Sequence, residues 1–214
     1  MIFNQQAAIK TAKYLLQINA IKLSPENPFS WASGWKSPIY CDNRIALSYP
    51  LIRNYIADQI TIQVKSIHKN QKFIIAGVAT GAIGIGMLVA HKMNRPFIYV
   101  RPETKKHGKK NQIEGYIPKN PKIIVIEDLI STGKSSLNAV EALKKIGADV
   151  IGMFGIFSYE LNIAQKNFNK SNIKLSTLCS YDILVKEAIK QNIINSDSLN
   201  KLSEWKKSPE NWGS

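Results

Sequence analysis

Acidic residues, cysteine and histidine are all scarce in this sequence. Its 214 residues include 15 Asp and Glu against 29 Lys and Arg, with two cysteines and three histidines. Cys41 and Cys179 show neither CxxC nor metal-ligand spacing, so we expect reduced thiols and not a disulfide. The histidines are scattered along the chain, and this argues against a clustered zinc site.

Long apolar runs are also missing. No stretch is long enough to span a bilayer, and residues 1–20 lack the apolar core and cleavage site of a signal peptide. We therefore expect a cytoplasmic protein with no membrane partner. The length, with 44% hydrophobic and 9% aromatic residues, suits a single domain over residues 1–214, since no repeat or interdomain linker is visible.

A formal net charge of +14 raises the question of nucleic-acid binding. The lysines, however, are spread along the whole chain, in the company of abundant Asn and Ile. A solvated lysine surface accounts for most of this charge, so no nucleic-acid partner is expected. A regulator that binds nucleic acid stays open as an alternative.

Apolar periodicity predicts that strands alternate with helices, as in a mainly parallel, right-handed α/β sheet. The expected helices cover residues 5–19, 50–69, a segment ending at 93, 135–146, 161–168, 181–191 and 198–206. The expected strands cover residues 73–78, 96–100, 123–126, 150–157 and 173–178.

The most informative segment is residues 123–136, with the sequence IIVIEDLISTGKSS. Four apolar residues form a strand buried on both faces, which runs into Glu127 and Asp128 and then into a Ser/Thr/Gly turn before a helix. The free N–H groups at a helix N-terminus suit a phosphate. Carboxylates beside an anion site suit sugar hydroxyls on the same ligand, with Mg²⁺ nearby. The segment therefore predicts a sugar-phosphate site.

Two other interpretations of this segment were weighed. The Gly-Lys-Ser at 133–135 resembles the end of a P-loop, but that motif requires a glycine where Asp128 stands. The segment is otherwise an ordinary surface turn after a core strand, and the segment alone leaves that interpretation open.

The loop 101–115 concentrates positive charge after the strand 96–100. It contains one acid, Glu103, and its cationic and histidine side chains are Arg101, Lys105, Lys106, His107, Lys109 and Lys110. We expect a mobile loop at the ligand edge of the sheet, able to close over a polyanion and to neutralise a leaving pyrophosphate. A solvated loop without function is the alternative.

Two further segments surround these features. Residues 28–44 interleave aromatic side chains with hydroxyls and cations, which suits a flat anionic heteroaromatic ligand, although the segment on its own favours a packed surface hairpin. Residues 77–86 are rich in glycine but contain no G-x-G-x-x-G. Their backbone amides could hold an anion, or the glycines could serve only close packing of helix on sheet.

Taken in order, FSWASGWKSPIYCDNR, RPETKKHGKKNQIEG and IEDLISTGKS resemble the orotate phosphoribosyltransferases, a family of type I phosphoribosyltransferases, over essentially the whole chain. The resemblance implies a mainly parallel, twisted sheet flanked by helices, with a small hood formed by about residues 1–45 and the C-terminal segment. It implies Mg²⁺-dependent transfer of a phosphoribosyl group from 5-phosphoribosyl 1-diphosphate to orotate, in pyrimidine biosynthesis. The products would be orotidine 5-monophosphate and pyrophosphate.

The resemblance also implies roles for individual residues. Glu127 and Asp128 would hold the ribose hydroxyls. The whole ribose 5-phosphate site would comprise Glu127, Asp128, Leu129, Ile130, Ser131, Thr132, Gly133, Lys134 and Ser135.

The diphosphate would be bound by Arg101, Lys105 and His107, and the catalytic residues would be Lys105, His107 and Asp128. Orotate would contact Ser131, Lys36, Tyr40 and Arg44. The implied cofactor, Mg²⁺, would be held mainly by the diphosphate without a direct side-chain ligand. The implied assembly is a homodimer with shared active sites.

Several positions depart from the family pattern. Pro102, Ala32 and the neighbourhood of Gly81 stand where some members carry a lysine, and Lys134 stands where glycine is common. Individual diphosphate and orotate contacts are therefore in doubt. A purine phosphoribosyltransferase stays open as an alternative, but the aromatic and cationic segment 28–44 favours orotate.

Overall fold

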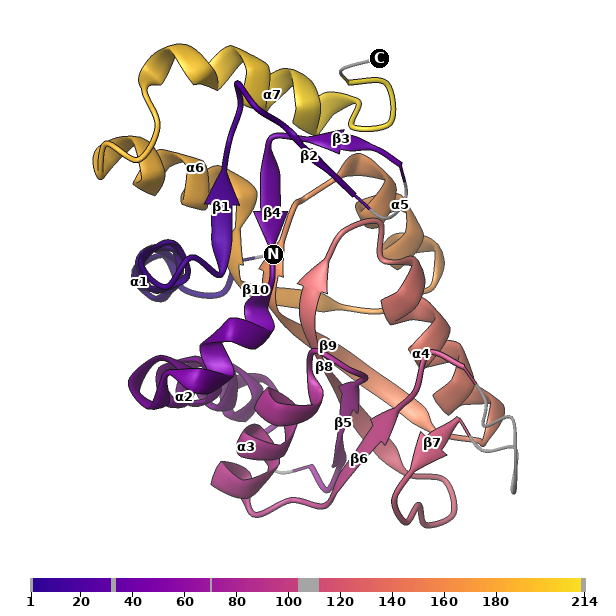
Figure 1. Ribbon diagram of the computed structural model, residues 1–214. Helices are drawn as coiled ribbons and strands as arrows, with labels where there is room; N and C mark the ends of the chain where they lie inside the picture. The colour runs from indigo at the N-terminus through magenta and orange to yellow at the C-terminus, as the bar shows by residue number, and fades with distance from the viewer. Residues whose placement is uncertain (1, 32–33, 70, 104–111, 213–214) are drawn as a thin grey trace.

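The computed structural model describes residues 2–31, 34–69, 71–103 and 112–212 (Figure 1). Its centre is a six-stranded sheet in the order β10-β9-β8-β5-β6-β7. Five neighbouring strands are parallel, and β7 pairs antiparallel with β6 at one edge. The predicted mainly parallel α/β sheet is therefore confirmed. The strands are β5 (Ile74–Val78), β6 (Phe97–Val100), β7 (Ile113–Glu114), β8 (Lys122–Ile130), β9 (Asp149–Ser158) and β10 (Leu175–Ser180).

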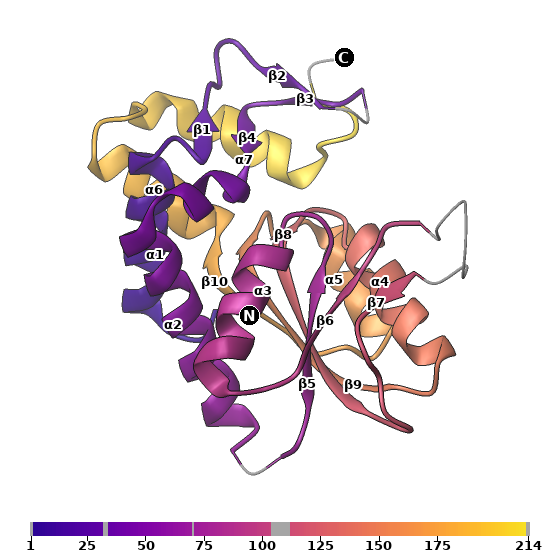
Figure 2. The ribbon, with the colours of Figure 1, turned by 60° about the horizontal axis from the view of Figure 1, so that its bottom comes forward.

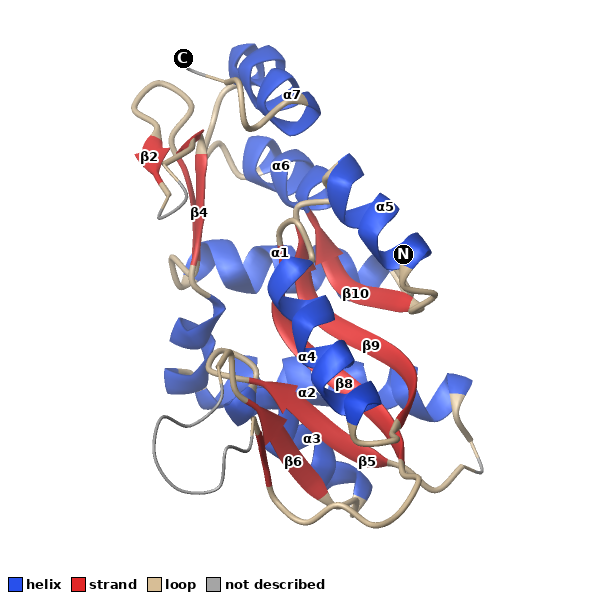
Figure 3. Cartoon of the chain, turned by 90° about the vertical axis from the view of Figure 1, so that its right-hand side faces the viewer, coloured by secondary structure: helices blue, strands red, loops and turns tan. Residues whose placement is uncertain are grey.

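Helices cover both faces of this sheet (Figures 2 and 3). One buried cluster joins the sheet to α1, α2, α3 and α6, and a second joins it to α4 and α5. Within β8, Ile124 and Ile126 belong to the first cluster, whereas Ile123 and Val125 belong to the second, as the two-residue period of a strand requires. The helices are α1 (Gln5–Gln17), α2 (Pro50–Ile67), α3 (Ile83–Met93), α4 (Lys134–Lys145), α5 (Asn162–Lys170), α6 (Tyr181–Lys190) and α7 (Leu199–Lys207), with short 3-10 helices η1 (Asn43–Ser48) and η2 (Ser196–Ser198).

Element boundaries differ from the sequence prediction at several places. The first helix ends at Gln17, two residues early, and Asn19 takes the left-handed conformation with φ 54°. The signature strand does not stop at residue 126, because its pairing with β9 continues to Ile130 and Ser158. The segment 101–121, expected to be a loop, contains β7, which at two residues is too short to leave a periodic signal.

A separate group of short strands lies beyond the carboxyl ends of the sheet strands, next to α7 (Figures 1 and 2). We call this group and α7 the hood. β1 (Ile21–Leu23) pairs with β4 (Ile39–Cys41), and β2 (Phe29–Ser30) pairs with β3 (Lys36–Ser37), both antiparallel. The β2–β3 pair is the surface hairpin that residues 28–44 were able to form.

The order of strands places a topological switch point between β5 and β8. From β5 the chain goes to β6 on one side, and later to β8, β9 and β10 on the other. In open α/β sheets, ligands bind at the carboxyl ends of the strands at such a point. The loop after β5 and the residues at the end of β8 are therefore where a site is expected.

Candidate active site

The two adjacent carboxylates near the end of β8 have different environments. Glu127 is only 3% exposed, and its carboxylate accepts hydrogen bonds from the Ser136 hydroxyl (Oε2, 2.7 Å) and the Asp128 backbone N–H (Oε1, 3.0 Å). Burial and the neighbouring charge of Asp128 raise the pKa of Glu127. Asp128 is half-buried. Asp128 is therefore the more accessible of the two carboxylates, and Glu127 is held by α4 and the backbone.

The loop after β5 lies directly against Asp128. A β-carbon placed on Gly81 would fall 2.0 Å from the Oδ2 atom of Asp128, so only glycine allows this approach. The Ala79–Thr80 peptide bond in the same loop is cis. The glycine-rich segment and the acidic pair, 47 positions apart in sequence, thus lie side by side at the switch point.

The predicted phosphate loop connects β8 to α4. Gly133 has φ 77°, and a β-carbon there would meet the Phe168 ring at 2.7 Å. The Thr132 carbonyl accepts a hydrogen bond of 2.9 Å from the Asn167 side chain of α5. Lys134, the first residue of α4, has an exposed side chain. Contacts with α5 therefore hold the loop in place. The first N–H groups of α4 lie at the edge formed by the carboxyl ends of the strands, where they can stabilise an anion.

Arg101 stands where β6 leaves the sheet. Its backbone N–H donates to the Gln112 carbonyl (2.8 Å), and the Gln112 side chain donates back to the Arg101 carbonyl (2.9 Å). The Arg101 guanidinium lies 3.5 Å from the Glu114 carboxylate in β7. The predicted loop thus returns to the sheet as an antiparallel strand. Lys105 and His107 lie outside the described residues.

Of the predicted base-binding residues, Lys36 in β3 and Tyr40 in β4 lie in the hood, Arg44 lies in η1 just after β4, and Ser131 follows β8. Lys36 donates a hydrogen bond of 2.9 Å to the Ser30 hydroxyl, and the 42% exposed Tyr40 packs against Phe29 with ring centroids 5.7 Å apart. The Arg44 guanidinium donates to both carboxylate oxygens of Asp42, at 2.7 and 2.8 Å.

The charge of Asp128 links these hood residues to the sheet edge. Burial is the main cause of the raised pKa of the Cys41 thiol, and the charge of Asp128 raises it further. The pKa of Arg44 is raised mainly by Asp42, and Asp128 adds to this effect. The charge at the sheet edge therefore acts on residues 41–44.

Aromatic rings from distant parts of the chain hold the hood to the sheet. The Trp31 ring lies 5.6 Å from that of the fully buried Trp205 in α7 and 5.1 Å from that of Tyr159, which follows β9. The Trp31 indole N–H donates to the Ile39 carbonyl at 3.1 Å. One aromatic core thus joins β2, β4, β9 and α7.

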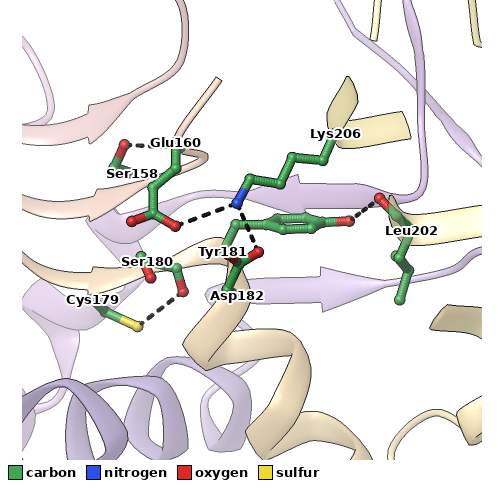
Figure 4. A network of polar contacts seen from close by, with 8 residues as sticks. All are labelled: Ser158, Glu160, Cys179, Ser180, Tyr181, Asp182, Leu202 and Lys206. Atoms are coloured by element: carbon green, nitrogen blue, oxygen red, sulfur yellow. Dashed lines mark hydrogen bonds and ion pairs between the residues drawn. The ribbon is translucent and has the colours of Figure 1, made fainter. Parts of the chain in front are cut away.

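A polar network fixes α7 beside this aromatic core (Figure 4). The Lys206 ammonium lies 2.7 Å from Asp182 at the start of α6 and 3.4 Å from Glu160 after β9. The Tyr181 hydroxyl donates to the Leu202 carbonyl at 3.0 Å. The C-terminal helix is therefore anchored to the carboxyl ends of β9 and β10.

Sequence reasoning missed three contributors to the site. Ser136 was outside the predicted site although it bonds Glu127. Neither of the two interpretations of the glycine-rich loop included the approach of Gly81 to Asp128. Asn43 donates a hydrogen bond of 2.6 Å to the Asp128 carbonyl. The contacts of Gly81 and Asn43 cross 47 and 85 positions of sequence, so no local pattern could reveal them, whereas Ser136 is the last residue of the segment 123–136.

Two findings concern metals and membranes. Among the described residues, no three His, Cys, Asp or Glu side chains gather into a group that could hold a metal ion. Within the same residues, no helix has the length and apolar character needed to cross a bilayer.

Comparisons with known proteins agree with this geometry. The model of the phosphoribosyl transferase domain family matches residues 52–174, more than half of the chain. An orotate phosphoribosyltransferase of Cytophaga hutchinsonii is 52% identical over 95% of this chain and 97% of its own length. That of Porphyromonas gingivalis is 48% identical over 94% of this chain and 96% of its own length.

Solved structures give the same result. The orotate phosphoribosyltransferase of Aeropyrum pernix has a TM-score of 0.72 at 25% identity, covering 86% of this chain and 99% of the other. UMP synthase of Leishmania donovani has a TM-score of 0.76 at 26% identity, covering 94% of this chain but only 42% of the longer protein. The predicted type I phosphoribosyltransferase fold is thereby confirmed.

Proposed function

The chain belongs to the orotate phosphoribosyltransferase family, and we propose how its sheet edge and hood divide the reaction of that family between them. The reaction transfers the phosphoribosyl group of 5-phosphoribosyl 1-diphosphate to orotate, giving orotidine 5-monophosphate and pyrophosphate in pyrimidine biosynthesis. The observation that carries this assignment is the contact between Gly81 and Asp128, since it brings the glycine loop and the acidic pair into one crevice.

Asp128 holds the ribose hydroxyls of the donor. Its carboxylate is half-buried and lies at the switch point, and carboxylate oxygens accept hydrogen bonds from hydroxyls. Glu127 serves the same ribose from a buried position, where Ser136 and the Asp128 N–H fix its orientation. The pair thereby orients the ribose for attack at its anomeric carbon.

The 5-phosphate binds in the loop from Ser131 to Ser135. Gly133 turns the backbone into α4, and Asn167 fixes the carbonyl of Thr132, so the loop is preorganised before ligand arrives. The N-terminal N–H groups of α4 and the cationic side chain of Lys134 favour a dianion. Leu129 and Ile130 belong to this site through their backbone, as the last residues of β8.

The diphosphate lies toward the glycine loop and Arg101, with Lys105 and His107 closing over it. Breaking the bond to pyrophosphate leaves positive charge on the ribose and negative charge on the leaving group, so catalysis consists of positioning and charge stabilisation. Mg²⁺ supplies further neutralisation of the diphosphate. The ion would be held mainly by the diphosphate itself, since Mg²⁺ is commonly bound through substrate phosphates and keeps several of its waters.

Orotate binds between the hood and the sheet edge. Ser131, Lys36, Tyr40 and Arg44 supply its contacts, with cations for its carboxylate and an aromatic ring beside its plane. Orotate attacks through an already anionic ring, so no dedicated general base is required.

The active assembly is a homodimer whose basic loop serves the neighbouring subunit. Exposed apolar side chains on α2 and α3 support an interface, notably Leu51 (67% exposed), Ile62 (53%) and Met87 (49%). If the sites are shared, mixing inactive Lys105→Ala and Asp128→Asn proteins restores part of the activity, because one site of each mixed dimer is intact. Verified mixed dimers without recovery would remove the shared site from the proposal.

The proposed reaction is tested by orotate ultraviolet absorbance. Purified protein, orotate, 5-phosphoribosyl 1-diphosphate and Mg²⁺ are mixed, with omission of donor or metal as controls. A loss of absorbance that requires both donor and Mg²⁺ supports the proposal. Turnover of a purine base in place of orotate would overturn the assignment of orotate as the substrate. Donor binding without turnover of any base would favour the regulator alternative.

A further inference from the structure

Asn43 connects the hood to the end of β8. It is the first residue of η1 and only 2% exposed. Its side-chain amide donates a hydrogen bond of 2.6 Å to the Asp128 carbonyl. This carbonyl belongs to the residue whose carboxylate lies against Gly81, so Asn43 contacts the backbone of Asp128 and not its carboxylate.

Two sets of contacts hold the segment that carries Asn43, one within the segment itself and one with α3. Asp42, just before it, accepts hydrogen bonds from the Arg44 backbone N–H (3.2 Å) and from the Arg44 guanidinium. At the other end of η1, Leu47 packs so closely on α3 that a β-carbon on Gly84 would lie 2.7 Å from its side chain. A displacement of residues 41–48 is therefore transmitted to Asp128 through Asn43.

Asp128 has little freedom to absorb such a displacement. Its carboxylate lies against the Gly81 backbone, and its N–H donates to Glu127. A small shift of its carbonyl therefore reorients the carboxylate that faces the ribose. Packed groups of this kind change between discrete arrangements and do not deform continuously.

We propose that Asn43 is a positioning residue that couples orotate binding in the hood to ribose binding at Asp128. The inference rests on the proposed function, because it takes the hood as the orotate site and Asp128 as the ribose site. Orotate contacts at Tyr40 and Arg44, on either side of Asn43 in sequence, stabilise one placement of η1, and Asn43 transmits this placement to Asp128. Because linkage is reciprocal, bound ribose phosphate strengthens orotate binding by the same factor.

The coupling is measured by isothermal titration calorimetry, which gives the dissociation constant of orotate with and without saturating ribose 5-phosphate. These two ligands cannot react, since ribose 5-phosphate lacks the leaving diphosphate. We expect ribose 5-phosphate to tighten orotate binding by about fivefold or more in the natural protein. In Asn43→Ala the ratio of the two orotate dissociation constants falls toward one.

Asn167→Ala is the matched control. It removes an amide-to-carbonyl hydrogen bond of similar length, 2.9 Å to Thr132, that does not involve the hood. It is expected to weaken ribose 5-phosphate binding. At saturating ribose 5-phosphate, however, the ratio of the two orotate dissociation constants should stay the same as in the natural protein. Asn43→Ser, with a small polar side chain, tests the proposal if Asn43→Ala fails to fold.

Each outcome decides the proposal. Full coupling in folded Asn43→Ala or Asn43→Ser would overturn it, and so would the absence of coupling in the natural protein. Loss of coupling in Asn167→Ala to the same degree would also overturn it, since the effect would not be specific to the hood connection. If neither ligand binds the natural protein, the proposed function itself fails, and that result is distinct from binding without coupling.

Discussion

At the carboxyl end of β8, residues 122–145 supply strand, loop and helix in one unbroken run, whereas the hood is assembled from four short strands between residues 21 and 41 and from α7 at residues 199–207. The first region is held by the parallel pairing of β8 with both β5 and β9. The second relies on strands of two or three residues and on the aromatic core of Trp31, Tyr159 and Trp205. Both regions line the same crevice, but different interactions form them.

The difference between the two regions matches the difference between the two substrates that we propose for them. The donor is a phosphorylated sugar, and it needs fixed carboxylates and N–H groups, which a sheet edge supplies without rearrangement. The base is flat and aromatic, and in the proposed arrangement it binds to side chains on the short elements of the hood. We therefore expect the hood to lose its arrangement more readily than the sheet edge.

Truncation of the aromatic core has the largest expected effect on stability. Trp205→Ala removes a fully buried indole, and loss of such a side chain costs about 3–5 kcal/mol of unfolding free energy. Leu143→Ala, in the fully buried core between α4 and the sheet, costs about 2–5 kcal/mol. Urea denaturation checks both values. In addition, Trp205→Ala should raise the KM for orotate, whereas Leu143→Ala should not; an equal rise in both would contradict the comparison.

Removal of one charge at the sheet edge should affect catalysis without affecting folding. Asp128→Asn keeps the shape of the side chain but removes the carboxylate that faces the ribose, and a lost preorganised contact of this kind costs about 10²–10³ in rate. We expect kcat/KM for the donor to fall by about 100-fold or more, with an unchanged Tm. Asp149→Asn, an exposed carboxylate at the opposite end of β9, is the control. Near-normal donor kinetics in Asp128→Asn would assign Asp128 a purely structural role.

The Ser136 hydroxyl should contribute stability that depends on pH. Ser136→Ala leaves an oxygen of the buried Glu127 without its donor, at a cost of about 1–3 kcal/mol. Because the pKa of Glu127 is raised in the folded chain, the folded state binds its proton more tightly than the unfolded state. Stability therefore falls as pH rises from the ordinary pKa through the raised one.

Loss of the Ser136 hydroxyl raises the pKa of Glu127 further. The variant should therefore lose more stability at a pH above the raised pKa than at a pH below the ordinary pKa of a glutamate. Urea denaturation across the pH range measures this difference, with Ser135→Ala as the exposed control. A destabilisation that is independent of pH would contradict an effect through the Glu127 carboxylate.

The smallest effect is expected at the polar network of α7. Lys206→Gln removes ion pairs to Asp182 and Glu160, both of which have substantial solvent exposure. Such pairs contribute about 0.2–1 kcal/mol at low salt and less at high salt. Thermal denaturation at two salt concentrations checks this, with Lys207→Gln as the exposed neighbour. A loss of several kcal/mol would show that the hood depends on charge and not on its aromatic core.

The sheet edge was largely predictable because its signals are local. The apolar run of residues 123–126, followed by two acids and a Ser/Thr/Gly turn, predicts a buried strand, a loop and a helix. The hood was less predictable, because its two-residue strands have no period and its core joins Trp31 to Trp205 across the length of the chain. The roles of Gly81 and Asn43 depend on contacts with Asp128, which form only when the sheet has folded.

The most direct test is to measure KM for both substrates in two variants, Asp128→Asn at the sheet edge and Trp205→Phe in the hood. The division of the site predicts that Asp128→Asn changes the donor KM more than the orotate KM, and that Trp205→Phe does the reverse. If both variants change the same substrate most, the sheet edge and the hood do not divide the two substrates between them, and the proposed arrangement is contradicted.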